Sequence, residues 1–144
     1  PVLFSMAEWA TWNEVFAIQI DGPPEVGKPL RITSHWEDGT TSVSNEKIVT
    51  VEYPSRMCWE YQDLPQWLLG TDRCISLAEA QDFDGKPITH LANYEVFDGP
   101  VSTFVKWYKG YLIEDGFRKF NRALKTKISG KPRPAWVDIG GAVA

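Results

Sequence analysis

The sequence predicts an α+β domain in which a curved antiparallel β-sheet wraps around a long C-terminal α-helix, with short helices at the N-terminus. Three observations lead to this fold. Six segments between residues 15 and 98 have the composition or alternation of β-strands and are separated by turn residues. One long amphipathic segment follows, and no other segment is large enough to cover the apolar face of the sheet. At 144 residues the chain suits one domain.

The first elements are short helical turns over residues 2–12 and an apolar strand over residues 15–21, which ends at a Gly-Pro-Pro sequence. Residues 30–37 alternate apolar and polar side chains, as a strand with one buried face does. Asp38-Gly39 then predicts a two-residue hairpin turn, because both residue types tolerate a positive φ. The remaining expected strands are residues 41–53, 57–62, 72–80 and 87–98, with a turn at Pro54-Ser55, a loop over 63–70 and a second two-residue turn at Asp84-Gly85.

The last predicted element is a long helix that opens at Gly99-Pro100, since proline suits the first helical position. Gly110 and Gly116 lie inside it, where they should permit a bend. Residues 131–144 are rich in proline and glycine and are expected to form a flexible tail. One apolar stripe follows the helical period: Ile113, Phe117, Phe120, Leu124 and Ile128.

The composition excludes several classes of protein. A formal charge of −4 argues against a nucleic-acid partner, and no apolar run is long enough for a membrane span, so we expect no stable membrane insertion. Nine basic residues fall between 104 and 133, which indicates a solvated helix back or a weak contact with an anionic membrane. Two cysteines are too few for a disulfide scaffold, and no signal peptide is visible. We therefore expect a cytoplasmic monomer or homodimer.

Several short motifs resemble successive landmarks of one superfamily. They are Trp9-x-x-Trp12-Asn13, Gly27-x-Pro29-Leu30-Arg31-Ile32, Pro54-x-x-Met57-x-Trp59, Tyr94-Glu95-x-Phe97-x-Gly99-Pro100 and Gly116-Phe117-x-x-x-Asn121-Arg122-Ala123-Leu124-Lys125. As a set they resemble the START-like, polyketide-cyclase/dehydrase and lipid-transport group, known as SRPBCC, whose members have the helix-grip fold. The resemblance implies a domain over residues 1–130. The family's first strand is missing here or precedes Pro1.

The resemblance implies two functions of different classes. One is a cofactor-free cyclase or dehydratase that acts on a polyketide-like hydrophobic substrate by acid–base catalysis in an internal pocket. The other is a non-catalytic carrier of a hydrophobic metabolite or lipid, so that the partner in either case is a small hydrophobic molecule. A co-chaperone module of the same fold would leave the aromatic residues of the cavity side without a role. Neither His35 nor His90 has the spacing of a metal site, and we expect no metal.

Hairpin arithmetic predicts which side chains face the pocket. A two-residue turn at Asp84-Gly85 places Cys74 opposite Glu95, on the inner face, whereas Cys58 points outward. We therefore expect no disulfide between the two cysteines. The alternative register would bring Arg73, Ile75, Leu77, His90 and Tyr94 inside, and a single β-bulge would reverse one strand. The preferred inner set is Leu30, Ile32, Ser34, Trp36, Val43, Val49, Val51, Met57, Trp59, Tyr61, Asp72, Cys74, Leu91, Asn93, Glu95 and Phe97.

Asp72 and Glu95 are the predicted catalytic pair. Two carboxyls on neighbouring strands in an apolar enclosure can divide the work, because burial keeps one protonated as an acid while the other acts as a base. A structural alternative pairs Glu95 with a helix cation, Arg118 or Arg122. The predicted ligand-binding residues, which core packing alone would also explain, are Trp36, Trp59, Tyr61, Cys74, Asn93, Phe97, Tyr108 and Tyr111.

Overall fold

The computed structural model describes residues 2–130 and 142–143. Two short 3₁₀ helices come first, strands follow, and one long helix precedes a last short strand, as the sequence predicts for all but that strand. The elements are η1 (Val2–Phe4), η2 (Met6–Thr11), β1 (Phe16–Gln19), β2 (Pro29–His35), β3 (Thr41–Glu52), β4 (Arg56–Tyr61), β5 (Gly70–Gln81), β6 (Pro87–Asp98), α1 (Ser102–Ser129) and β7 (Ala142–Val143).

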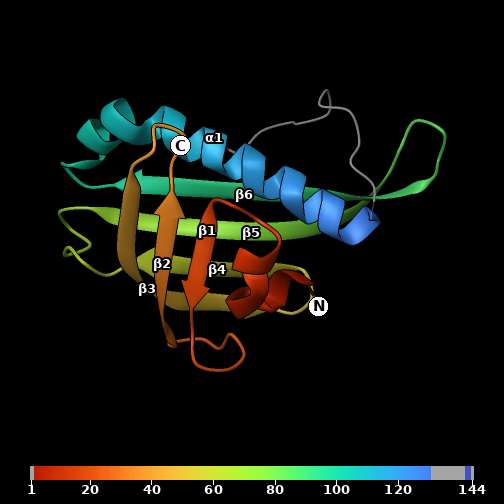
Figure 1. The fold of residues 1–144 in the computed structure, drawn as a ribbon, viewed down its shortest axis with the longest axis horizontal. Coiled ribbons are helices and arrows are strands. Elements are labelled where there is room, and N and C mark those ends of the chain that lie inside the picture. The colour runs from red at the N-terminus through yellow and green to blue at the C-terminus, as the bar shows by residue number, and fades with distance from the viewer. Residues whose placement is uncertain (1, 131–141, 144) are drawn as a thin grey trace.

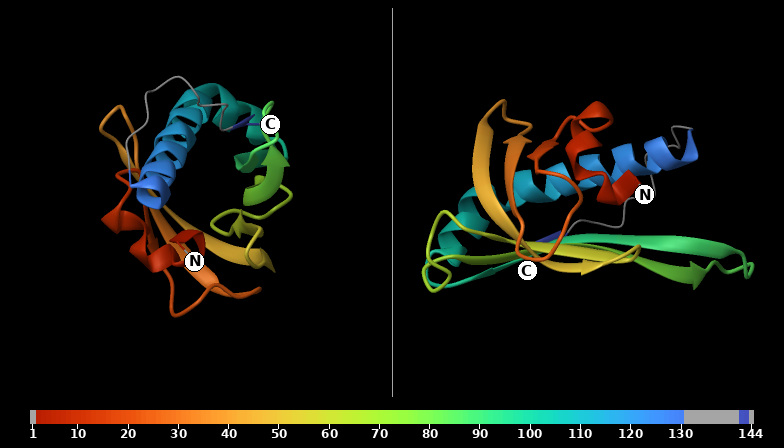
Figure 2. Two further views of the ribbon diagram at one scale, coloured as in Figure 1. Left: turned by 90° about the vertical axis from the view of Figure 1, so that its right-hand side faces the viewer. Right: turned by 90° about the horizontal axis from the view of Figure 1, so that it is seen from below.

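The strands form one sheet in chain order, and β1 to β6 pair antiparallel with their sequence neighbours (Figure 1). The sheet is strongly curved, and α1 lies across its concave side (Figure 2). This arrangement is the predicted α+β architecture. The predicted tail of residues 131–144 lies outside the described residues except for β7, which pairs parallel with β6 beside Tyr94 and Glu95.

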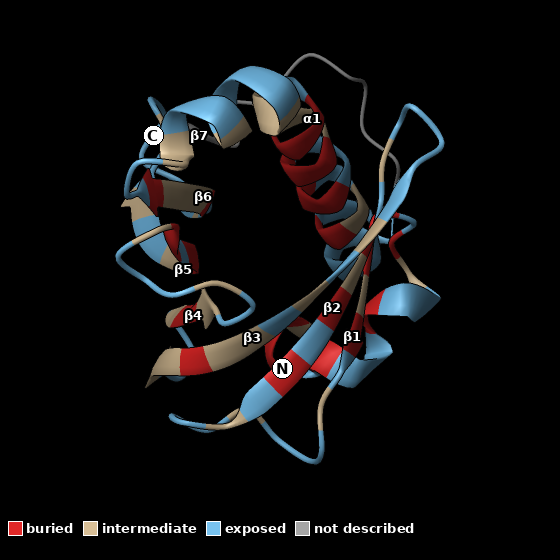
Figure 3. Cartoon of the chain, turned by 90° about the vertical axis from the view of Figure 1, so that its left-hand side faces the viewer, coloured by how far each residue is buried: buried red, intermediate tan, exposed pale blue. Residues whose placement is uncertain are grey.

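The hydrophobic core lies between the concave face of the sheet and the C-terminal two thirds of α1 (Figure 3). Four residues of the predicted stripe, Ile113, Phe117, Phe120 and Leu124, are buried, whereas Ile128 is exposed. The helix bends between its exposed N-terminal turns and this buried part (Figure 3). The core residues from the strands include Phe16, Ile18, Leu30, Ile32, Ile48, Met57, Trp59, Ile75 and Phe97.

The N-terminal helices close one end of this core. Trp9 of η2 is fully buried, donates its ring N–H to the carbonyl of Leu3 and packs against Phe120 with ring centroids 4.7 Å apart. Asn13 connects η2 to β1, because its side-chain oxygen accepts the backbone N–H groups of residues 15 and 16 while its amide donates to the Trp9 carbonyl. Such an asparagine satisfies backbone groups that the end of the short helix leaves unpaired.

Gly116 sets how closely α1 approaches the sheet side of the molecule. A Cβ atom at this position would lie 3.1 Å from the Trp36 ring and 3.2 Å from a methyl of Val15. At Gly110 a Cβ atom would meet nothing within 4 Å. The two helix glycines therefore differ in role, since only Gly116 is required by a close contact.

Both long hairpins have three-residue loops instead of the predicted two-residue turns. Asp82 and Lys86 form a bonded pair around Phe83-Asp84-Gly85, and Gly85 has a φ of 75°. Trp36 and Thr40 do the same around residues 37–39. A type I turn followed by a left-handed glycine produces this loop. The extra loop residue shifts the predicted register by one position.

The shift moves one strand of each hairpin to the other face. Arg73, not Cys74, is opposite Glu95, so the prediction that Asp72 and Cys74 face inward was wrong. The predicted inward Val43 is also wrong, since it is 48% exposed. In β3 a bulge at Val49 leaves Ile48 facing Trp59 on the inner side. The remaining sheet positions of the predicted inner set are buried or partly buried, and both histidines are exposed as expected.

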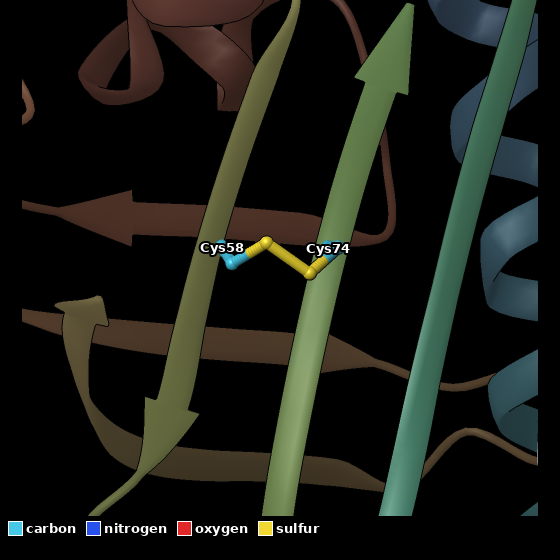
Figure 4. Close-up of a disulfide and its surroundings, with 2 residues drawn as sticks. All are labelled: Cys58 and Cys74. Carbon is cyan, nitrogen blue, oxygen red and sulfur yellow. A yellow bond between two sulfur atoms is a disulfide. The ribbon is translucent and has the colours of Figure 1, made fainter. Parts of the chain in front are cut away.

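The corrected register brings the two cysteines together. Cys58 and Cys74 are directly opposed on β4 and β5, with 4.2 Å between their Cα atoms, and form a disulfide on the outer face of the sheet (Figure 4). The prediction of no disulfide was therefore wrong. Its cause was the one-residue register error, which had placed the two side chains on opposite faces.

Within residues 2–130 and 142–143, no helix has the length and apolarity needed to span a bilayer. Most basic residues of α1 are exposed, on the side of the helix that the sequence predicts to face solvent. One of them, Lys119, forms an ion pair with Asp115 at 2.9 Å. That pair and the one between Arg118 and Glu114 join residues four apart along the helix.

Candidate functional site

The candidate site is centred on a row of side chains that crosses the inner face of four strands. Ile48 of β3 is opposite Trp59 of β4, Trp59 is opposite Arg73 of β5, and Arg73 is opposite Glu95 of β6. Opposed residues of antiparallel strands point to the same face, and this face lies under α1. The row therefore places one cation and one carboxyl inside an otherwise apolar core.

Arg73 is 7% exposed, and aromatic rings surround its guanidinium. The guanidinium carbon lies 4.1 Å from the centre of the Phe16 ring, 4.5 Å from that of Phe117 and 5.3 Å from that of Trp59. Burial lowers the pKa of Arg73 to about 10, although Glu95 and Glu46 favour its charged form. Arg73 therefore stays protonated at neutral pH, and the rings stabilise the cation through its faces.

The hydrogen-bonding groups of this site are not all satisfied. Nε and Nη2 of Arg73 are buried and have no hydrogen-bond partner, and the same holds for Oδ1 of Asn93. The amide of Asn93 donates to Oδ1 of Asn121 on α1 at 3.4 Å. Buried polar atoms without partners are rare in proteins and costly, which makes Arg73 and Asn93 candidates for contact with a ligand. Nε of Arg56, opposite Ser76 on β5, is also buried without a partner.

Glu95 is half-buried and shares the inner face with Arg73. Burial raises the pKa of its carboxyl, and the neighbouring Arg73 charge opposes this rise. A sheet cation therefore acts on Glu95. Of the two helix cations that the structural alternative names, Arg118 pairs with Glu114 on the helix.

Glu46 is a second inward-facing carboxyl, on β3 opposite Tyr61. Burial raises its pKa to about 7, with a further rise from the charge of Glu95, while the Ser44 side chain and Arg73 lower it. At neutral pH this carboxyl is thus divided between its acid and base forms. That is the condition under which one group can both accept and donate a proton.

Glu46 also lines a groove of about 870 Å³. This volume falls in the range of small-molecule sites, roughly 300–1,000 Å³, although the groove is widely open to solvent. The groove lies between η2 and strands β1 to β3, and much of its lining is apolar. Arg73, Asn93 and Glu95 do not line it. Besides Glu46, its residues are Ala7, Ile18, Gln19, Ile20, Asp21, Gly27, Pro29, Leu30, Arg31, Asn45, Lys47 and Gln62.

The predicted site residues divide into those at this face and those elsewhere. Trp59, Asn93, Glu95 and Phe97 lie on the inner face, and Tyr61 and Trp36 are partly buried against the core. Asp72 is exposed on the outer face and does not face Glu95. Cys74 is held in the disulfide. Tyr108 and Tyr111 are exposed on the N-terminal part of α1, at 60% and 64%.

Sequence reasoning missed Glu46 and gave Arg73 only as the alternative register. The signal that could have found both is the Asp-Gly pair preceded by one more polar or aromatic residue, which suits a three-residue loop as well as a two-residue turn. With the longer loop, Arg73 is opposite Glu95 and Glu46 is opposite Leu30. Among the described residues, no three His, Cys, Asp or Glu side chains form a cluster suited to a metal ion.

Comparison with known proteins gives one distant relative. The chain is 30% identical over 66 residues to the Oxopyrrolidines biosynthesis cluster protein O of Penicillium oxalicum. The match covers 41% of this chain and 33% of that protein, so the chain matches about a third of the length of its curated relative. No protein-family model matches the chain, and no solved structure matches it significantly. The resemblance to the START-like group stays a prediction, with which the sheet and C-terminal helix are compatible.

Proposed function

We propose that this chain acts in the biosynthesis of a secondary metabolite, as a cofactor-free cyclase or dehydratase for a hydrophobic, polyketide-like substrate. The observation that carries the proposal is the pair of partly buried glutamates on the inner face. Glu46, with a pKa of about 7, lines a groove of small-molecule size, and Glu95 is close enough to raise that pKa further. Glu46 takes the place that the sequence assigned to Asp72.

The pair suits proton transfer at carbon. The deprotonated glutamate removes a proton from the carbon beside a carbonyl, and the resulting enolate attacks a second carbonyl of the same molecule to form a carbon–carbon bond. The protonated glutamate gives its proton to the alkoxide that this attack forms, which becomes a hydroxyl. In the dehydration the glutamate that has lost its proton removes the second proton from the same carbon. The other glutamate, which took up the first proton, donates it to the hydroxyl, which leaves as water as the double bond forms. Burial raises the pKa of both carboxyls, and that of Glu46 reaches about 7, so Glu46 is present in both its acid and its base form near neutrality.

The relative adds support of a coarser kind. Its name places it in an oxopyrrolidine biosynthesis cluster, which favours a role for this chain in secondary metabolism without naming a reaction. We further propose, from the sequence pattern, that residues 1–130 form the functional domain and that the protein is cytoplasmic.

A model reaction tests the catalytic proposal. Heptane-2,6-dione cyclises by aldol addition and loses water to give 3-methylcyclohex-2-enone, whose ultraviolet absorbance reports turnover. The wild type should accelerate this reaction, and Glu46→Gln and Glu95→Gln should each slow it about a hundredfold, because a positioned acid or base typically contributes 10²–10⁴-fold. Asp72→Asn should have no effect, since Asp72 is exposed on the opposite face.

A non-catalytic carrier is the second candidate, and the largely apolar lining of the groove favours it. It predicts that hydrophobic molecules bind but that none turns over. Equal rates for the wild type and both glutamine variants in the heptane-2,6-dione assay, with retained binding of an apolar ligand, would contradict the enzyme and support the carrier.

A further inference from the structure

The unpaired atoms of Arg73 form one edge of its guanidinium. Nε–H and the N–H of Nη2 on the same side are parallel and separated by the distance between the two oxygens of a carboxylate. Both atoms are buried and neither has a hydrogen-bond partner. A buried donor without a partner loses its hydration and regains nothing, and the loss is greatest for a charged group. The free edge therefore requires an acceptor.

Aromatic rings lie close to the guanidinium of Arg73. The rings of Phe16 and Phe117 lie within 4.5 Å of the guanidinium carbon, and Trp59 lies slightly further away. Aromatic rings stabilise the charge but cannot accept its N–H groups as a carboxylate oxygen does. Glu95, opposite Arg73 on the next strand, accepts no hydrogen bond from Nε or Nη2. Both atoms are covered by protein, so a ligand reaches the fork only when neighbouring side chains move.

We propose that Arg73 binds the carboxylate of a small organic acid through Nε and Nη2, and that the acid has an aromatic or apolar body which lies among the neighbouring rings. This assignment rests on the proposed function only in placing the ligand on the inner face, and it specifies the substrate class. The unpaired Oδ1 of Asn93, which is 1% exposed, accepts a hydroxyl or amide donor of the same ligand. Asn93 lies two residues from Glu95 on β6, on the same face.

Isothermal titration calorimetry with two matched probes tests the assignment. 2-Naphthoate and 2-naphthamide share an aromatic body, but only the first has a carboxylate. The wild type should bind 2-naphthoate at least tenfold more tightly, because a paired, charge-assisted fork is worth more than one factor of ten in affinity. Arg73→Met keeps the apolar stem and should abolish the preference. Arg118→Met, which removes an exposed helix arginine, should leave it unchanged.

Arg73→Lys provides a second variant in case Arg73→Met does not fold, as circular dichroism would reveal. Lysine keeps the charge but not the fork, so the preference should fall several-fold without disappearing. Glu95→Gln should strengthen 2-naphthoate binding or leave it unchanged, because it removes a negative charge beside the ligand carboxylate.

Equal affinities of the two probes for the wild type, or a preference that survives in Arg73→Met, would overturn the assignment, as would the absence of binding by either probe. Its failure is distinguishable from failure of the proposed function. Turnover of heptane-2,6-dione without a carboxylate preference would support the proposed catalysis and contradict carboxylate binding at Arg73. A carboxylate preference without turnover would support binding at Arg73 and contradict the proposed catalysis.

Discussion

At the scale of the residue, the raised pKa of Glu46 makes the stability of the protein depend on pH. This pKa rises from 4.5 to about 7 because the folded protein buries the carboxyl. Between these values the folded state binds more protons than the unfolded chain. The free energy of unfolding therefore falls as the pH rises from 4.5 to 7 and is level above that. The total loss is up to roughly 3 kcal/mol, at 1.36 kcal/mol per pKa unit.

Glu46→Gln should remove this dependence. We predict that the variant is more stable than the wild type at pH 8 by up to about 3 kcal/mol, and that the difference disappears near pH 4.5. Urea unfolding at several pH values measures both. Glu25→Gln is the matched control, since the Glu25 side chain is 68% exposed and its removal should not change the pH dependence. If the free energy of unfolding changed with pH in the same way for the wild type and for Glu46→Gln, Glu46 would not be buried as described.

At the scale of the element, the disulfide between β4 and β5 is the feature with the clearest energetic effect. It closes a chain segment of sequence separation 16. A cross-link over such a loop stabilises the folded state by about 3 kcal/mol, chiefly by restricting the unfolded chain. The disulfide lies on the outer face, away from Arg73 and Glu95, so its removal should affect stability without changing the ligand site.

We predict that a reductant lowers the free energy of unfolding of the wild type by about 2–4 kcal/mol. It should have no effect on the double variant Cys58→Ala/Cys74→Ala, which should match the reduced wild type approximately. Denaturant unfolding with and without dithiothreitol measures this. Mass spectrometry after alkylation under non-reducing conditions gives an independent readout. Two labelled cysteines in the folded protein would contradict the disulfide between Cys58 and Cys74.

The elements themselves follow from the sequence much better than their register does. The alternation in residues 30–37 and the stripe from Ile113 to Leu124 predict a strand and a helix, because burial on one face imposes these periods. The two Asp-Gly loops predict hairpins correctly but not their length. Since side chains alternate along a strand, one additional loop residue places Arg73 on the inner face, where the sequence predicted Cys74.

The same error explains which parts of the site could be predicted. Glu95, Asn93 and Phe97 were placed correctly because β6 has its predicted orientation. Arg73 and Glu46 were not, because each lies on the strand of its hairpin that the loop length displaces. The unpaired state of the Arg73 fork depends on contacts among β1, β4, β5 and α1, which no local pattern contains.

At the scale of the whole molecule, the curved sheet and the helix enclose polar groups that a packed core would not need. Phe117 and Phe120 of α1 are buried. The opposite face of the helix is exposed (Figure 3) and carries most of its charged residues. Beneath the helix lie the buried Arg73 and Asn93, together with Glu46 and Glu95, whose pKa values are raised. A core selected for stability alone would replace such a group with apolar side chains at no loss. We interpret their presence as the mark of a ligand site.

A crystal structure of the protein grown with 2-naphthoate tests this interpretation most directly. We predict electron density for the carboxylate at Nε and Nη2 of Arg73, with the naphthalene rings on the inner face of the sheet beneath α1. A structure in which Arg73 is paired with Glu95, the inner face is filled by side chains and the probe lies elsewhere would contradict it.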